Sequence, residues 1–177
     1  MAKYPQSVID RYLRRVYVFK SMSWDGRDYG GTYDHDSRTV YLTMDDWYRS
    51  ADVEEAFFHE FASILLAWAP AKFKLKEWAP LNDFEAYEQL PANEGNLDDE
   101  DSLEYDPKLQ AEGYLNEYAM TNAEEDFDVV SEGLFSGNPA FWAAVDRFPK
   151  IRQKAREAMA FYWNVHPWFT ESYFRSL

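Results

Sequence analysis

The spacing of apolar positions predicts a helix, two strands and a loop in the N-terminal quarter of the chain. In PQSVIDRYLRR (5–15), four apolar residues fall on one helical face: Val8, Ile9, Tyr12 and Leu13. VYVFKSM (16–22) then changes to a strand-like pattern, and RTVYLTM (38–44) alternates apolar and polar residues as a half-buried strand does. The stretch between these two strands is rich in glycine and aspartate, which favours a turn and a loop.

The rest of the chain is predicted to be mainly helical. A long helix is expected from about Ser50 to Ala69, and helices resume at Asn122, which is a suitable N-cap, and continue as a final pair over 140–148 and 150–163. Residues 70–107 look irregular, and the acidic run 93–106 is expected to be a surface loop. The prediction is a single α+β domain, 1–177, with a small, mostly antiparallel sheet followed by a helical body.

Charge and composition narrow the classes of partner. The net charge is -14 over 177 residues, which argues against nucleic acid and against anionic membrane surfaces as partners. The basic clusters RYLRR (11–15) and KIRQKAR (150–156) are interpreted as solvated helix faces. No apolar run has the length of a membrane span, and no signal peptide is recognised, so a cytoplasmic location is the default expectation. Secretion by a route without a signal peptide stays compatible with the sequence.

The segment FFHEFASILL (57–66) contains part of a metal-binding pattern. Zinc hydrolases place two histidines at i and i+4 on a helix, and the glutamate after the first histidine serves as general base. His59 and Glu60 fit that pattern, but Ser63 stands at the position of the second histidine, and a hydroxyl is a poor zinc ligand. Taken alone, the segment favours a packed core histidine.

A second segment, YAMTNAEEDF (118–127), could complete such a site. A glutamate on a second helix can supply a third ligand, and a nearby tyrosine hydroxyl can stabilise the oxyanion of a tetrahedral intermediate. A structural explanation exists as well, because Asn122 followed by Glu125 is a pattern typical of a capped helix N-terminus.

The segment from Tyr118 to Glu125 resembles the Y-x-x-T-N-x-x-E motif of lethal-factor-type gluzincin metallopeptidases. The order along the chain is similar, with an HEF helix first, this segment second and a Pro149-Lys150 pair after it. GGTYDHDSRTVYL (30–42) also resembles the strand that precedes the zinc helix in bacterial zinc-peptidase proteins of this type. The resemblance implies a zincin-like fold and a zinc cofactor.

In that resemblance each matched position has a role. His59 is implied as the first zinc ligand, Glu125 as the third ligand, Glu60 as the general base and Tyr118 as the catalytic tyrosine, and Ser63 is the departure from the family pattern. His35 and His166 are the other two histidines, and nothing in the sequence brings them to the site. A site with one histidine, one glutamate and waters would shift the metal preference towards harder ions such as manganese, magnesium or calcium.

Three functions fit the sequence. The first is a zinc-dependent metallopeptidase that hydrolyses peptide bonds through metal-activated water. The second is an inactive pseudo-peptidase that binds a peptide or protein. The third is an acidic inhibitor-type protein that binds a basic partner through its negative surface.

Overall fold

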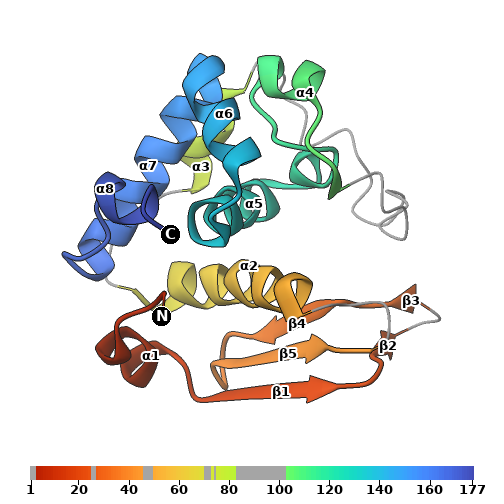
Figure 1. Ribbon diagram of the computed structural model, residues 1–177. Coiled ribbons are helices and arrows are strands. Elements are labelled where there is room, and N and C mark those ends of the chain that lie inside the picture. Colours follow the sequence, from red (N-terminus) through yellow and green to blue (C-terminus); the bar gives the residue numbers. More distant parts are fainter. Residues whose placement is uncertain (1–2, 25–26, 46–49, 70–72, 74, 83–102) are drawn as a thin grey trace.

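The computed structural model describes residues 3–24, 27–45, 50–69, 73, 75–82 and 103–177. Most of the predicted acidic loop 93–106 therefore lies outside the described residues. The architecture is mixed α+β, as expected, with a small sheet below and helices above it (Figure 1). Among the described residues, no helix is long and apolar enough to cross a membrane.

The main sheet has three strands in the order β1-β5-β4. β1 (Arg15–Phe19) pairs in parallel with β5 (Thr39–Thr43), and β4 (Gly31–Asp34) pairs antiparallel with β5. A separate short hairpin joins β2 (Ser23–Trp24) to β3 (Arg27–Asp28).

The prediction of a mostly antiparallel sheet was wrong for the pairing of β1 with β5. The sequence reading assigned residues 31–34 to a loop, whereas they form β4 and turn back into β5 through Asp34–Arg38. Because β4 reverses the chain, β5 runs in the same direction as β1. Arg38 has a left-handed φ of 53° in this turn, and the Asp34 side chain accepts the backbone N–H groups of Asp36 and Ser37.

Helix α2 (Ser50–Trp68) covers one face of the sheet, and α5 (Ala123–Ser136) lies on the other side of α2 (Figure 1). α2 is buried in the middle of the molecule, with Phe61, Ile64 and Leu65 fully inaccessible to solvent. Burying side chains of this size stabilises the fold by about 1.5–3 kcal/mol each. The two segments that carry the predicted site residues therefore meet because α2 and α5 pack against each other.

The remaining helices surround these two. α1 (Gln6–Tyr12) precedes the sheet, and the short helices α3 (Leu75–Trp78) and α4 (Pro107–Glu112) precede α5 in the chain. The 3-10 turns lie at Ala79–Leu81 and Tyr118–Met120. α6 (Pro139–Arg147), α7 (Pro149–Val165) and α8 (Glu171–Phe174) complete the upper part of the molecule (Figure 1).

Neither basic cluster is simply a solvated helix face. Lys154, in α7, is fully buried and forms an ion pair with Asp126 of α5, which is also fully buried. The same Asp126 carboxylate accepts from the Trp78 indole nitrogen at 2.7 Å. Buried charges require such partners, and a charge pattern along one helix does not show them. In the other cluster, Arg15 opens strand β1 rather than extending α1.

Candidate metal centre

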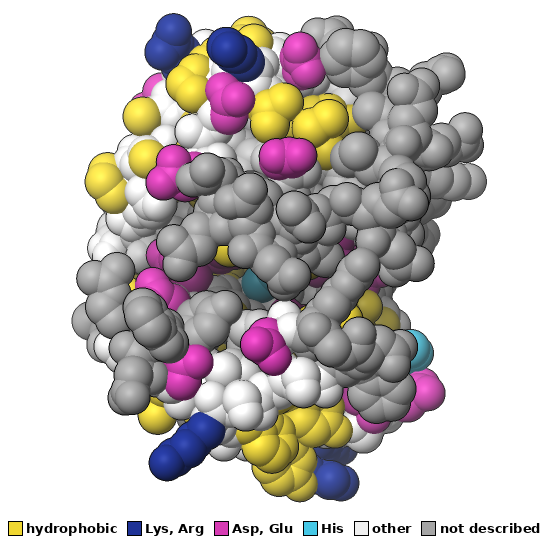
Figure 2. All heavy atoms as spheres, turned by 90° about the vertical axis from the view of Figure 1, so that its right-hand side faces the viewer, with side chains coloured by type: hydrophobic (Ala, Val, Ile, Leu, Met, Phe, Trp, Pro, Cys, Tyr) yellow, Lys and Arg dark blue, Asp and Glu magenta, His cyan; other side chains and the backbone are white. Residues whose placement is uncertain are grey.

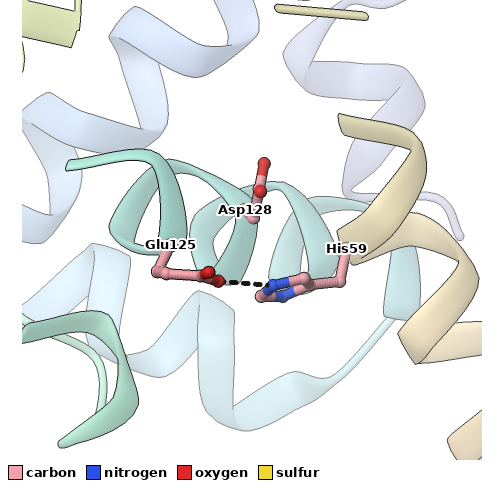
Figure 3. Close-up of side chains that lie close together, drawn as sticks. All are labelled: His59, Glu125 and Asp128. Atoms are coloured by element: carbon pink, nitrogen blue, oxygen red, sulfur yellow. Dashed lines mark hydrogen bonds and ion pairs between the residues drawn. The ribbon is translucent and has the colours of Figure 1, made fainter. Parts of the chain in front are cut away.

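The structure brings His59 and Glu125 together, as the sequence predicts. His59 is on the third turn of α2, and Glu125 is in the first turn of α5, whose N-cap is Asn122. The Asn122 side chain accepts the backbone N–H groups of Glu124 and Glu125 at 2.9 and 3.0 Å, which confirms the predicted cap. His59 Nε2 lies 2.9 Å from Glu125 Oε2 (Figure 3).

Asp128 is a third member of this site that the sequence reading missed. One ligand atom each of His59, Glu125 and Asp128 lie within 4.8 Å of one another. Asp128 is 2% exposed, and its Oδ1 atom has no hydrogen-bond partner in the structure. A buried carboxylate oxygen without a partner is costly, so this oxygen has capacity for a further interaction.

Ser63 lies one helical turn beyond His59 and contacts Asp128. Ser63 Oγ is 2.5 Å from Asp128 Oδ2 and 2.8 Å from Glu124 Oε1. A hydroxyl has one proton, so Ser63 can donate to one of these two oxygens at a time. Burial raises the pKa of Asp128 well above its ordinary value, and the hydrogen bond that Ser63 donates offsets part of this effect. Tyr33 donates to the same Glu124 oxygen at 2.5 Å.

The charges of His59 and its carboxylate neighbours are coupled. Burial alone would lower the pKa of His59, but hydrogen bonds to Glu125 and Glu132 raise it well above its ordinary value. His59 Nδ1 lies 3.6 Å from Glu132 Oε2. Burial would raise the pKa of Glu125, and the hydrogen bond from His59 overcomes this effect and lowers it. The two ring nitrogens of His59 therefore each face a carboxylate.

Glu60, the predicted general base, lies against strand β4. Burial raises the pKa of the Glu60 carboxyl to about 7. A Cβ atom at Gly31 of β4 would lie only 2.7 Å from Glu60 Oε1, so the absence of a side chain there leaves the space that this carboxylate occupies. Within the described residues, no Lys or Arg forms an ion pair with Glu60, Glu125 or Asp128.

Tyr118, the predicted catalytic tyrosine, also faces the site. Its ring centroid is 5.6 Å from that of His59. Burial raises the pKa of the Tyr118 hydroxyl, and the neighbouring charges of Glu125 and Glu60 and a hydrogen bond to Glu125 raise it further. The hydroxyl is therefore a hydrogen-bond donor throughout the neutral pH range.

The acidic neighbours of Glu125 and the other two histidines do not join the site. Glu124 bonds Ser63 and Tyr33, and Asp126 points to Lys154, so neither joins the candidate ligands. His35 is in the exposed turn between β4 and β5, and His166 is the C-cap of α7.

A sequence signal for the missed residues does exist. Asp128 and Glu132 follow Glu125 by three and seven residues, which is the spacing of one helical face. The acidic first turn of α5 masked that signal, because acidic residues are expected there for helix capping and dipole reasons alone.

Comparison of the chain with protein-family models, with curated proteins and with solved structures gave no match. The likeness to lethal-factor-type peptidases thus depends on the matched residues alone.

Proposed function

We propose that this protein is a zincin-like, metal-dependent hydrolase of peptide bonds, in which His59, Glu125 and Asp128 hold the metal. The observation that carries the proposal is the convergence of the three ligand atoms within 4.8 Å, together with the unpartnered buried oxygen of Asp128. Asp128 supplies the third protein ligand that Ser63 does not provide, and the Ser63 hydroxyl holds Asp128 in place.

The donor set suits a divalent cation. One imidazole and two carboxylates make three protein ligands, the number found in catalytic zinc sites. The two carboxylate oxygens also fit manganese. A cation would offset the repulsion between Glu125 and Asp128, which contributes to the raised pKa of Asp128. Glu132 faces the second nitrogen of His59 and orients the ring, as carboxylates beside metal-bound histidines commonly do.

The protein's own groups then have separate roles. When bound, a divalent ion supplies Lewis acidity that polarises a peptide carbonyl and makes a water more acidic. The Glu60 carboxylate accepts the proton of the attacking water and passes it to the leaving amine. The Tyr118 hydroxyl donates to the oxyanion that develops on the carbonyl oxygen, after it leaves Glu125.

The proposal is tested by metal analysis and peptide hydrolysis with the same variants. We expect one metal ion per chain after dialysis against Zn²⁺ or Mn²⁺, and cleavage of a quenched fluorescent peptide library. Asp128→Asn keeps the shape of the side chain and should weaken metal binding at least about tenfold. Glu60→Gln should keep the metal and lower hydrolysis by roughly 10²–10⁴-fold.

Glu157→Gln is the matched control, because Glu157 is exposed on α7, which carries none of the candidate ligands. This variant should bind metal and cleave peptides as the unmodified protein does. A folded protein that takes up no Zn²⁺ or Mn²⁺ at micromolar concentration would contradict the proposal.

One observation favours a second function, that of an inactive peptide-binding relative of such enzymes. The His59–Glu125 pair satisfies both side chains at 2.9 Å without a metal. This alternative predicts peptide binding that is unchanged by Asp128→Asn and by chelators, with no hydrolysis.

A further inference from the structure

Strand β1 forms a long apolar edge at the side of the sheet opposite to β4. In the order β1-β5-β4 it has β5 as its neighbour on one side. All five of its residues are exposed, and Val16, Tyr17, Val18 and Phe19 are between 42% and 50% accessible. Edge strands with this composition are sites of pairing with other chains, and proteins usually protect them.

Both faces of this edge are apolar. Val16 and Val18 are in register with Val40 and Leu42, the two buried hydrophobic residues of β5. Tyr17 and Phe19 point to the opposite face, where both stack on Tyr41. Their ring centroids lie 5.7 and 6.4 Å, respectively, from that of Tyr41. Hydrophobic side chains gather at the sheet end of the molecule, with basic side chains on either side of them (Figure 2).

Among the residues that the structure describes, no strand pairs with the outer side of β1. The Phe19 carbonyl accepts from the Met44 N–H at 2.8 Å, so the Phe19 backbone faces β5. Backbone groups alternate sides along a strand, which places the N–H and C=O groups of Val16 and Val18 on the outer edge. These are the groups that an added strand would use.

The charge around this edge is opposite to that of the whole molecule. Residues 11–20 contain Arg11, Arg14, Arg15 and Lys20 and no acidic residue, in a chain with a net charge of -14. Arg14 and Arg15 lie at the beginning of the strand and Lys20 directly after its end. A partner strand therefore meets positive charge at both ends and apolar side chains between them.

A second copy of this chain does not fit these charges. Antiparallel pairing of two β1 strands would place Arg14 or Arg15 of one copy beside Lys20 of the other, at both ends of the pair. Like charges opposite each other destabilise a strand pair.

We propose that the outer edge of β1 binds an extended segment of a partner protein, with apolar residues in the middle and acidic residues at both ends. The segment adds a fourth strand, and the free backbone groups of Val16 and Val18 bond to it. The proposal is independent of the candidate metal centre, because β4 and not β1 lies beside Glu60.

The experiment uses the full chain and a defined probe, the acetylated peptide Glu-Glu-Val-Tyr-Val-Glu-Glu with a C-terminal amide. Titration followed by NMR should show saturable binding. Hydrogen exchange of the Val16 and Val18 amides should slow on binding, whereas the Tyr17 and Phe19 amides, which face β5, should change little. The peptide with lysine at every glutamate position should bind at least about tenfold more weakly, because each terminal attraction becomes a repulsion.

Two variants of the protein test the same edge. Lys20→Glu should weaken binding of the acidic peptide by about fivefold or more. Lys108→Glu is the matched control, since Lys108 is exposed on α4, and it should leave binding unchanged. Val18→Pro removes an outward N–H without removing a hydrogen bond to β5, and it should abolish binding while the protein stays folded by circular dichroism.

Several results would overturn the proposal. These are equal binding of the acidic and the lysine peptides, binding without protection of the Val16 and Val18 amides, and a dimer in sedimentation equilibrium that Val18→Pro abolishes. If Val18→Pro unfolds, the comparison of Lys20→Glu with Lys108→Glu decides.

Discussion

Gly31 is the residue on which the position of Glu60 depends. A Cβ atom at this place would lie 2.7 Å from Glu60 Oε1, closer than real side-chain contacts allow. Gly31 is not among the residues with positive φ, so its backbone conformation does not itself require glycine. The constraint is the space that the proposed general base needs.

Gly31→Ala should therefore displace the Glu60 carboxylate without unfolding the protein. We expect peptide hydrolysis to fall by about ten- to a hundredfold, since a shift of about 1 Å in a catalytic group has effects of this size. Metal affinity, measured by isothermal titration calorimetry, should stay the same because the ligands are on α2 and α5. An unchanged rate of hydrolysis would show that Glu60 is not the base.

Ser63 is the residue at which the sequence departs from the peptidase pattern, and the structure gives it a partner. Ser63→Ala removes the hydroxyl between Asp128 and Glu124, leaving a buried carboxyl without its hydrogen bond. We expect the free energy of unfolding, measured in urea, to fall by about 1–3 kcal/mol. Ser176→Ala, at an exposed serine, is the control and should change stability by less than about 0.5 kcal/mol. Equal stability of the two variants would show that the Ser63 hydroxyl does not stabilise the fold.

At the scale of elements, the contact of α5 with α7 contains the buried pair Asp126–Lys154. Breaking a buried pair by removing one partner costs about 3–5 kcal/mol, because the other charge stays buried and uncompensated. Lys154→Met, which has a similar volume, should lower the free energy of unfolding by this amount in chemical denaturation. Lys108→Met, on the surface of α4, should have little effect. A small effect of Lys154→Met would mean that Asp126 is neutral in the folded protein.

Arg175, the C-cap of α8, forms an exposed ion pair with Asp146 of α6, and acid weakens this pair. The hydrogen bond from Arg175 lowers the pKa of Asp146 below its ordinary value. A lowered carboxyl pKa contributes stability above the unfolded pKa, and that stability is lost as pH falls through the folded pKa. Arg175→Gln should raise the pKa of Asp146 in an NMR titration, whereas Arg147→Gln should not. If Arg175→Gln leaves the pKa of Asp146 unchanged, Arg175 and Asp146 do not form an ion pair in solution.

At the scale of the whole molecule, a bound metal would connect α2 with α5, the two helices at the centre of the fold. A ligand that binds only the folded state stabilises it by about 2.7 kcal/mol at a hundredfold excess over its Kd. Zn²⁺ or Mn²⁺ should therefore raise the Tm in calorimetry, and a chelator should reverse the change. Glu125→Gln should remove most of this shift, and an equal shift in that variant would place the metal elsewhere.

Local pattern determined much of the fold. The helical spacing of Val8 and Tyr12, the alternation in 39–43 and the Asn122 cap each depend on neighbours in the chain, and the structure confirms those elements. The predicted site residues also lie close together: His59 and Glu60 are neighbours on α2, Glu125 is in the first turn of α5, and Tyr118 is in the 3-10 turn that precedes α5.

Tertiary structure decided the rest. β4 exists because β5 pairs with it, the burial of Lys154 depends on Asp126 in another helix, and Asp128 becomes a candidate ligand because Ser63 in α2 holds it beside His59. Each of these depends on two segments that are distant in the chain and close in space. A pattern along a single segment contains no information on such a contact, and the packing of α2 between the sheet and α5 supplies it.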